Sequence, residues 1–149
     1  MPILVIADLH LDFWLGAGRD PFAALDPIVL ASLDALILAG DIANKPRVRW
    51  PNMFRHIACY VRPEITYVVP GNHDYFDHIV NGDERLRNIC DQAGVRFAQK
   101  SEIMLGEVRI LCCTLWTDFC LHGDPASAMR IAEQGMKDYR SGSVHRTRH

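Results

Sequence analysis

One stretch of the chain reads Ile65-Thr66-Tyr67-Val68-Val69-Pro70-Gly71-Asn72-His73-Asp74. Its first five residues are apolar or β-branched and Pro70-Gly71 stops the run, a pattern typical of a short strand buried in a parallel sheet. An amide, an imidazole and a carboxylate follow at once, and all three groups are common metal ligands. The stretch therefore predicts a strand with metal-binding side chains beyond its carboxyl end.

Two earlier stretches repeat this order of apolar strand and polar end. Pro2 to Ala7 runs into Asp8-Leu9-His10, and Ala35 to Gly40 runs into Asp41. In open α/β sheets the functional groups collect beyond the carboxyl ends of the strands. Carboxylates that meet there repel one another unless they are protonated or bridged by a cation. The three strand ends together predict a metal site.

Segments with helical spacing separate the strands and predict crossover helices. Asp26-Pro27 is a good N-cap followed by a first-turn proline, and Gly94 stands at a C-cap position. Pro51 is expected to be a break, after which the next apolar stripe begins. The chain before Asp26 is expected to be a loop around Gly16 and Gly18. The predicted helices cover about residues 28–33, 54–61 and 86–93.

The pattern changes after the third predicted helix. Residues 102–105 and 108–114 flank Gly106-Glu107, a pair suited to a two-residue turn, and so predict an antiparallel hairpin. Asp124-Pro125 then opens a last helix. Residues 140–149 are basic and without periodicity, which predicts a disordered tail after a folded domain of residues 1–139. The class expected is α/β, with parallel strands, crossover helices and a hairpin.

Composition limits the function. The chain has 149 residues with 49% hydrophobic residues, which suits one globular domain. A net charge of -2 argues against a nonspecific nucleic-acid surface, and no apolar run is long enough to span a membrane. Five cysteines without C-x-x-C spacing indicate reduced thiols. With no signal peptide at the start, we expect a cytoplasmic protein.

The spacing of the polar residues suggests individual roles. Asp8 and His10 are two apart, so on an extended segment their side chains point the same way and could bind one ion. Asp41 could bridge two cations through its two oxygens, and Asn72 offers a carbonyl oxygen to the second. His73 could donate a proton to a leaving oxygen or contact a developing negative charge.

Asp74 has a different expected role. It is placed to orient an imidazole through the second ring nitrogen, as outer partners do at metal sites.

The three motifs, Asp8-Leu9-His10, Gly40-Asp41 and Gly71-Asn72-His73-Asp74, resemble those of the calcineurin-like metallophosphoesterases, D-x-H, G-D and G-N-H-D in this order. The resemblance covers residues 1 to about 139. It implies an αββα sandwich and two divalent metal ions of the manganese, iron or zinc type. It also implies hydrolysis of a phosphate-ester small molecule or nucleotide by a hydroxide that both metals share.

By this resemblance each polar residue has a role. Asp8 and His10 would bind the first metal, Asp41 would bridge both metals, and Asn72 would bind the second. His73 would be the catalytic residue that assists the phosphoryl or leaving group.

The chain also departs from the family pattern. Relatives carry a further strand-end His and a G-H-x-H motif, and neither occurs here, so the first metal would lack one ligand and the second two. We therefore expect an amino-terminal portion of the sandwich with an exposed apolar face, and weak or absent hydrolysis of an aryl phosphate. The alternatives are a non-catalytic metal- or phosphate-binding remnant, half of a split enzyme, or a frameshifted product whose tail is out of frame.

Further expectations concern side chains outside the three motifs. We expect Asp12 to be solvated rather than a partner of a metal ligand, and His56 to be a surface residue without a role. Trp116 is expected to pack, although stacking on a substrate stays open. His145 and His149 are four apart, but the polar run around them disfavours the helix that would make them a metal pair.

Overall fold

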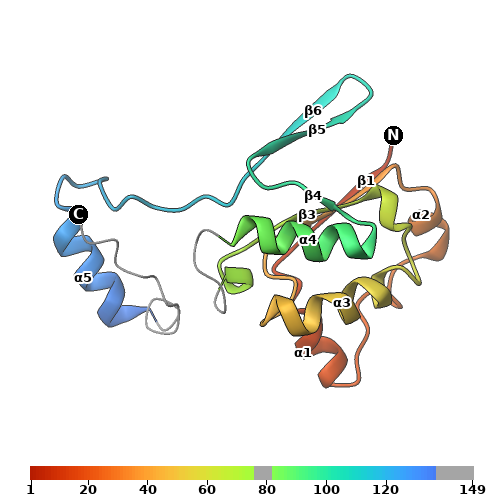
Figure 1. Ribbon diagram of the computed structural model, residues 1–149, viewed down its shortest axis with the longest axis horizontal. Coiled ribbons are helices and arrows are strands. Elements are labelled where there is room, and N and C mark those ends of the chain that lie inside the picture. Colours follow the sequence, from red (N-terminus) through yellow and green to blue (C-terminus); the bar gives the residue numbers. More distant parts are fainter. Residues whose placement is uncertain (76–81, 137–149) are drawn as a thin grey trace.

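Four parallel strands form the main sheet. The protein is described by a computed structural model over residues 1–75 and 82–136. Within these residues the strand order is β1-β2-β3-β4 (Figure 1). The strands are β1 (Ile3–Ala7), β2 (Ala35–Ala39), β3 (Thr66–Val69) and β4 (Arg96–Phe97). The predicted α/β class is confirmed.

Hydrophobic cores lie on both faces of this sheet, which explains why its strands read as unbroken apolar runs. Leu36 and Leu38 of β2 and Val68 of β3 belong to the larger core. Ile37, between the two leucines, belongs to a smaller core on the opposite face, because neighbouring residues of a strand point to opposite sides.

Helices cover the face that carries the larger core, and Figure 1 shows α3 and α4 lying across the sheet. The helices are α1 (Leu11–Gly16), α2 (Pro27–Ala31), α3 (Pro46–Ile57) and α4 (Asp83–Ala93), with 3-10 turns η1 (Pro63–Ile65) and η2 (His73–Tyr75). Trp50 and Phe54 of α3 and Leu86 of α4 fill the space beneath. The Asp26 cap, which accepts the N–H of Ile28, confirms the predicted start of α2.

An antiparallel hairpin covers part of the other face (Figure 1). It consists of β5 (Ser101–Leu105) and β6 (Val108–Cys112), and Gly106 in its turn has a φ of 58° that glycine adopts freely. Ile103 of β5 and Cys112 of β6 pack in the smaller core with Ile37 and Ala98. The predicted hairpin is confirmed.

The last described helix, α5 (Pro125–Gly135), begins as predicted, because the Asp124 side chain accepts the N–H of Ser127. None of its residues is buried. Figure 1 shows it at the far end of a long connection from β6, and its Ile131 is 70% exposed. Tertiary contacts therefore contribute little to this helix within the described part of the chain.

Two local expectations were wrong, and one element was missed. The expected loop around Gly16 begins as α1, since Leu11 is fully buried and anchors a short helix. The second crossover helix starts at Pro46 and continues through Pro51, so this proline is not a break. Packing of the α3 apolar face outweighs the hydrogen bond that a proline removes. The short strand β4 was not expected.

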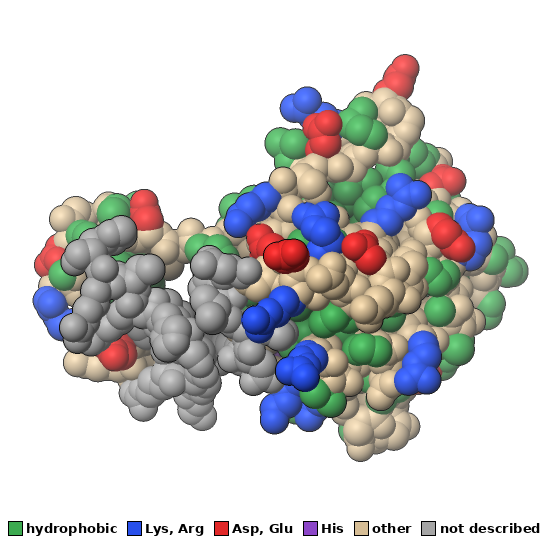
Figure 2. Space-filling model, viewed as in Figure 1, with side chains coloured by type: hydrophobic (Ala, Val, Ile, Leu, Met, Phe, Trp, Pro, Cys, Tyr) green, Lys and Arg blue, Asp and Glu red, His purple; other side chains and the backbone are tan. Residues whose placement is uncertain are grey.

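Exposed apolar side chains, as expected for an apolar face without a cover, occur on β1 and β6. Val5, in the middle of this edge strand, is 58% exposed, and Leu111 of β6 is 72% exposed. Lys, Arg, Asp and Glu are interspersed on the surface shown in Figure 2.

Among the described residues, no helix has the length and apolar character needed to cross a membrane. The predicted tail at 140–149 and the pair His145 and His149 lie outside the described residues.

Candidate metal centre

Strand register brings the three polar ends to one edge of the sheet. Ala7 of β1 pairs with Ala39 of β2, and Ala39 pairs with Val69 of β3. These residues are the last of their strands, so the polar stretches that follow them leave the sheet at the same level. The structure brings His10, Asp41 and His73 together at this edge.

Two glycines allow the ends of β2 and β3 to come this close. A Cβ on Gly71 would lie 2.1 Å from Oδ1 of Asp41 and 2.6 Å from its backbone nitrogen. A Cβ on Gly40 would lie 3.2 Å from the Cα of Gly71, and Gly40 has a φ of 92°. Both positions therefore require glycine for steric reasons.

Backbone hydrogen bonds connect the loop after β1 to the loop after β2. The N–H of His10 donates to the carbonyl of Asp41 at 2.7 Å, and the N–H of Leu11 donates to that of Ile42 at 2.8 Å. Asp8, His10 and Asp41 all have positive φ, between 42° and 51°. Left-handed backbone is unfavourable for such residues and is often found at functional sites.

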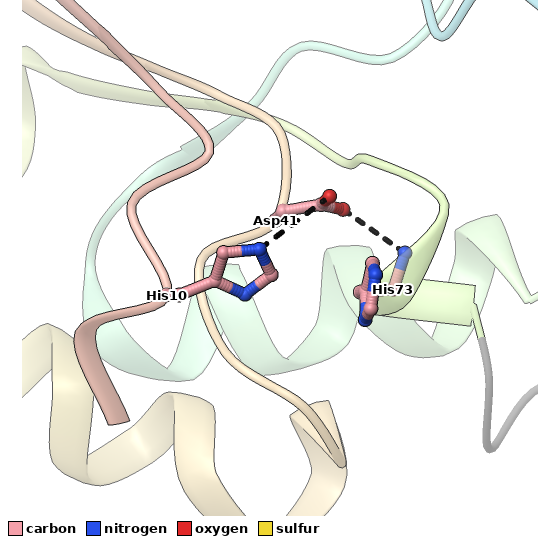
Figure 3. A group of neighbouring side chains, drawn as sticks. All are labelled: His10, Asp41 and His73. Carbon is pink, nitrogen blue, oxygen red and sulfur yellow. Dashed lines mark hydrogen bonds and ion pairs between the residues drawn. The ribbon is translucent and has the colours of Figure 1, made fainter. Parts of the chain in front are cut away.

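His10, Asp41 and His73 form the centre of the site (Figure 3). Their potential ligand atoms all lie within 4.8 Å of one another. Nε2 of His10 is 3.9 Å from Oδ2 of Asp41, and the N–H of His73 donates to Oδ1 of Asp41 at 2.9 Å. The two imidazole rings meet edge to face with centroids 5.0 Å apart. The three side chains thus converge on one point from three different loops.

The electrostatics of the group fit a divalent cation. Asp41 is only 5% exposed, and burial raises the pKa of its carboxyl, although the N–H of His73 and the nearby imidazoles oppose this. Nδ1 of His10 is buried and has no hydrogen-bond partner among the described residues. The nitrogen of His10 that faces Asp41 is Nε2, and a buried carboxylate and an imidazole nitrogen facing it are both stabilised by a cation between them. The donor set therefore fits a metal ion with oxygen and nitrogen ligands.

Asn44 fixes the ring of His73, and sequence reasoning missed it. Its Oδ1 lies 3.1 Å from Nδ1 of His73. A carbonyl oxygen can only accept, so the contact assigns a proton to Nδ1 and, in the neutral ring, the lone pair to Nε2. The ring is therefore set to coordinate a metal or accept a proton through Nε2. The only sequence signal was the position of Asn44 in the loop three residues after Asp41.

Asp74 does not orient an imidazole, which corrects the expectation from sequence. Its fully buried carboxyl accepts the N–H groups of Gly71 at 2.8 Å and Ile42 at 3.2 Å and the indole N–H of Trp50 at 3.3 Å. Burial raises the pKa of Asp74 to about 7, despite these hydrogen bonds. Asp74 connects the loops after β2 and β3 to α3, and so supports the site from behind.

The remaining predicted metal ligands lie beside this group. Asp8 is exposed and lies outside the three-residue cluster, but its charge contributes to the raised pKa of Asp41. Asn72 is partly buried, and its backbone carbonyl accepts the N–H of Tyr75. Both residues are therefore near the cluster, and their roles as ligands stay predictions.

Two other expectations need correction. Asp12 is not a solvated loop residue, because its side chain is 4% exposed and pairs with Arg49 of α3. His56 is not a free surface residue, because it is partly buried and its Nε2 lies 2.9 Å from Oδ2 of Asp20. Trp116 is half exposed, and its ring packs against that of Tyr75 with centroids 5.9 Å apart.

Comparisons with known proteins agree with this geometry. A family model described as calcineurin-like phosphoesterase matches residues 1–144. A solved structure of phosphopantetheinyl hydrolase from Mycobacterium tuberculosis is similar in fold, with 21% sequence identity and a TM-score of 0.57. The similarity covers 89% of this chain and 50% of that one, so the chain spans about half the length of that hydrolase. None of the curated proteins matches.

Proposed function

Because this chain belongs to the calcineurin-like phosphoesterase family, we propose that it binds divalent metal ions at the edge formed by β1, β2 and β3 and acts on phosphate esters. The convergence of His10, Asp41 and His73 within 4.8 Å is the observation that carries this proposal. The solved hydrolase of similar fold supports a partial αββα sandwich.

Four residues would be the ligands of the two metal ions. Asp8 and His10 would hold a first ion, Asp41 would bridge to a second, and Asn72 would hold the second. Ions of the manganese, iron or zinc type suit these ligands. When bound, they would supply positive charge for the phosphoryl group and lower the pKa of water.

His73 would be the catalytic residue. Its Nδ1 proton is directed to Asn44. This contact fixes the tautomer of the ring and leaves Nε2 free of that proton. In the neutral ring Nε2 accepts a proton or contacts a cation, and it donates to a leaving oxygen only when the ring is doubly protonated. The burial of Asp41 and Asp74 behind it keeps the position of the β3 loop fixed.

The substrate would be a phosphate-ester small molecule or a nucleotide. We expect slow turnover, because among the described residues the proposed ligands of the second ion are only Asp41 and Asn72. The five cysteines, which are all free thiols, support a cytoplasmic location. Residues 1–139 would form the catalytic domain portion.

Release of phosphate from an aryl phosphate and a nucleotide, measured with added manganese, iron or zinc, tests the proposal. We expect slow release that depends on metal and disappears in Asp41→Asn. Release that persists without metal or in Asp41→Asn would contradict the proposed chemistry. Turnover at rates ordinary for such hydrolases would contradict the expectation of a weakened site.

A second candidate is a non-catalytic metal- or phosphate-binding chain, or one half of a split enzyme. The exposed Val5 of β1 and the absence of buried residues in α5 favour it, since both surfaces suit a further partner. Mixing the chain with the carboxyl-terminal half of a family member separates these options. Recovered hydrolysis would indicate a split enzyme, and metal binding without hydrolysis would indicate a binding protein.

A further inference from the structure

We propose that Phe13 determines substrate specificity at the metal centre, by contacting an aromatic leaving group of the phosphate ester. This inference rests on the proposed function and names the substrate class for the same site. It starts from an exposed aromatic side chain directly beside a metal-ligating candidate. Phe13 is 59% exposed although it lies in α1, whose first residue is fully buried.

The position of Phe13 relative to the site is set by the backbone of α1. Its N–H donates to the carbonyl of His10 at 2.9 Å, and the ring centroids of the two residues are 5.8 Å apart with a tilt of 47°. The His10 ring in turn meets that of His73 at 5.0 Å. A row of three rings thus leads from the metal centre out to solvent.

The chemistry of this row favours a flat apolar group. A phosphoryl group near His10 and His73 would carry a leaving group that extends from the site past the side chains beside it. Beside His10 stands the exposed phenyl ring of Phe13, which offers neither charge nor hydrogen bond. Aromatic rings stabilise other rings through offset or edge contacts, and they offer much less to a small alkyl group. An aryl ester therefore gains a contact that a methyl ester does not.

Binding of non-hydrolysable analogues tests this without requiring turnover. The affinities of benzylphosphonate, methylphosphonate and inorganic phosphate are measured by calorimetry in the presence of manganese. We expect benzylphosphonate to bind about tenfold more tightly than methylphosphonate, which corresponds to one good aromatic contact. Phe13→Ala should reduce this ratio to about two or less, whereas Phe13→Tyr should keep it.

Matched controls separate specificity from a structural role. Ile28→Ala removes another exposed apolar side chain, 78% exposed in α2, and should leave the ratio unchanged. Phe13→Ala should also leave the affinity for inorganic phosphate within about twofold. If this variant instead loses phosphate and manganese binding, Phe13 only supports the His10 ring and the proposal is overturned.

The remaining outcomes distinguish this inference from the proposed function. Equal affinities of the two phosphonates for the unmodified chain, or a ratio that survives Phe13→Ala, would overturn the role of Phe13 and leave the proposed function standing. If the chain binds no inorganic phosphate with manganese, the proposed function fails and this inference fails with it.

Discussion

Replacement of Gly71 by alanine should disrupt the site more than any other single added methyl group near it. The new Cβ would lie 2.1 Å from Oδ1 of Asp41 and 2.6 Å from the backbone nitrogen of Asp41. Rotation of the Asp41 side chain relieves only the first contact, because the second is to backbone. The loops after β2 and β3 must therefore separate by about 1 Å before the methyl group fits.

The cost follows from what this separation breaks. Overpacking in a tight region typically costs about 1–3 kcal/mol. The shift would also lengthen the bond from the His73 N–H to Asp41 and that from the Gly71 N–H to Asp74, and bonds to charged groups contribute about 1.5–3 kcal/mol each. Since neither bond is lost completely, we expect Gly71→Ala to lower the free energy of unfolding by about 3 kcal/mol.

Urea denaturation followed by circular dichroism measures this loss, and manganese titration measures the site. Affinity for manganese should fall at least about tenfold, because the Asp41 carboxylate is displaced from His10 and His73. Gly16→Ala is the matched control, since a Cβ at Gly16 meets nothing within 4 Å, and it should be neutral or slightly stabilising. If Gly71→Ala matches Gly16→Ala in both measurements, the close approach of the two loops is not what holds the site together.

Two further predictions concern hydrogen-bonded side chains. Asn44→Ala removes the acceptor at Nδ1 of His73 and should weaken phosphate binding with manganese about tenfold, whereas Asn44→Asp should retain it; equal affinities in titrations of all three proteins would exclude this role. Burial raises the pKa of Asp20, but hydrogen bonds from Tyr60, His56 and the N–H of Phe22 lower it by more. The pKa of Asp20 therefore lies below its ordinary value of 3.8. Its contribution to stability is therefore present above pH 3.8 and lost as the pH falls through the lowered pKa. Asp20→Asn should cost about 1 kcal/mol near neutral pH, and the difference in urea unfolding should shrink below pH 4; a difference that does not change with pH would refute it.

Much of the fold follows from residues that act locally. The apolar run at 65–69, the Asp26 cap, Gly94 at the end of α4 and the turn at Gly106 each specify their element through nearest neighbours, and each prediction from them agrees with the structure. The convergence of the strand ends also follows, because parallel pairing in register requires it.

The errors share a tertiary cause. Pro51 is a helix breaker by local rules, but the buried side chains of Trp50 and Phe54 on both sides of it hold α3 together. The two residues of β4 are too few to give a pattern, and they pair with β3 because α4 returns the chain to the sheet edge. Local sequence carries no signal for either effect.

In the site, too, local sequence indicates some features and tertiary packing sets the others. The ligand candidates follow strands and were found, whereas the partners of Asp74 are an indole from α3 and two N–H groups from separate loops. Those donors come together only by packing, so the motif alone suggested an imidazole instead. Asn44 was missed for the same reason, since its contact with His73 joins residues far apart in the sequence.

Calorimetric titration of manganese into the chain and into Asp41→Asn tests most directly whether the strand ends form a metal centre. His122→Ala, at an exposed histidine outside the cluster, is the control. We predict that the unmodified chain and the control bind at least one ion with equal affinity, and that Asp41→Asn binds at least about tenfold more weakly. Absence of binding to the unmodified chain, or equal binding by Asp41→Asn, would contradict the metal centre.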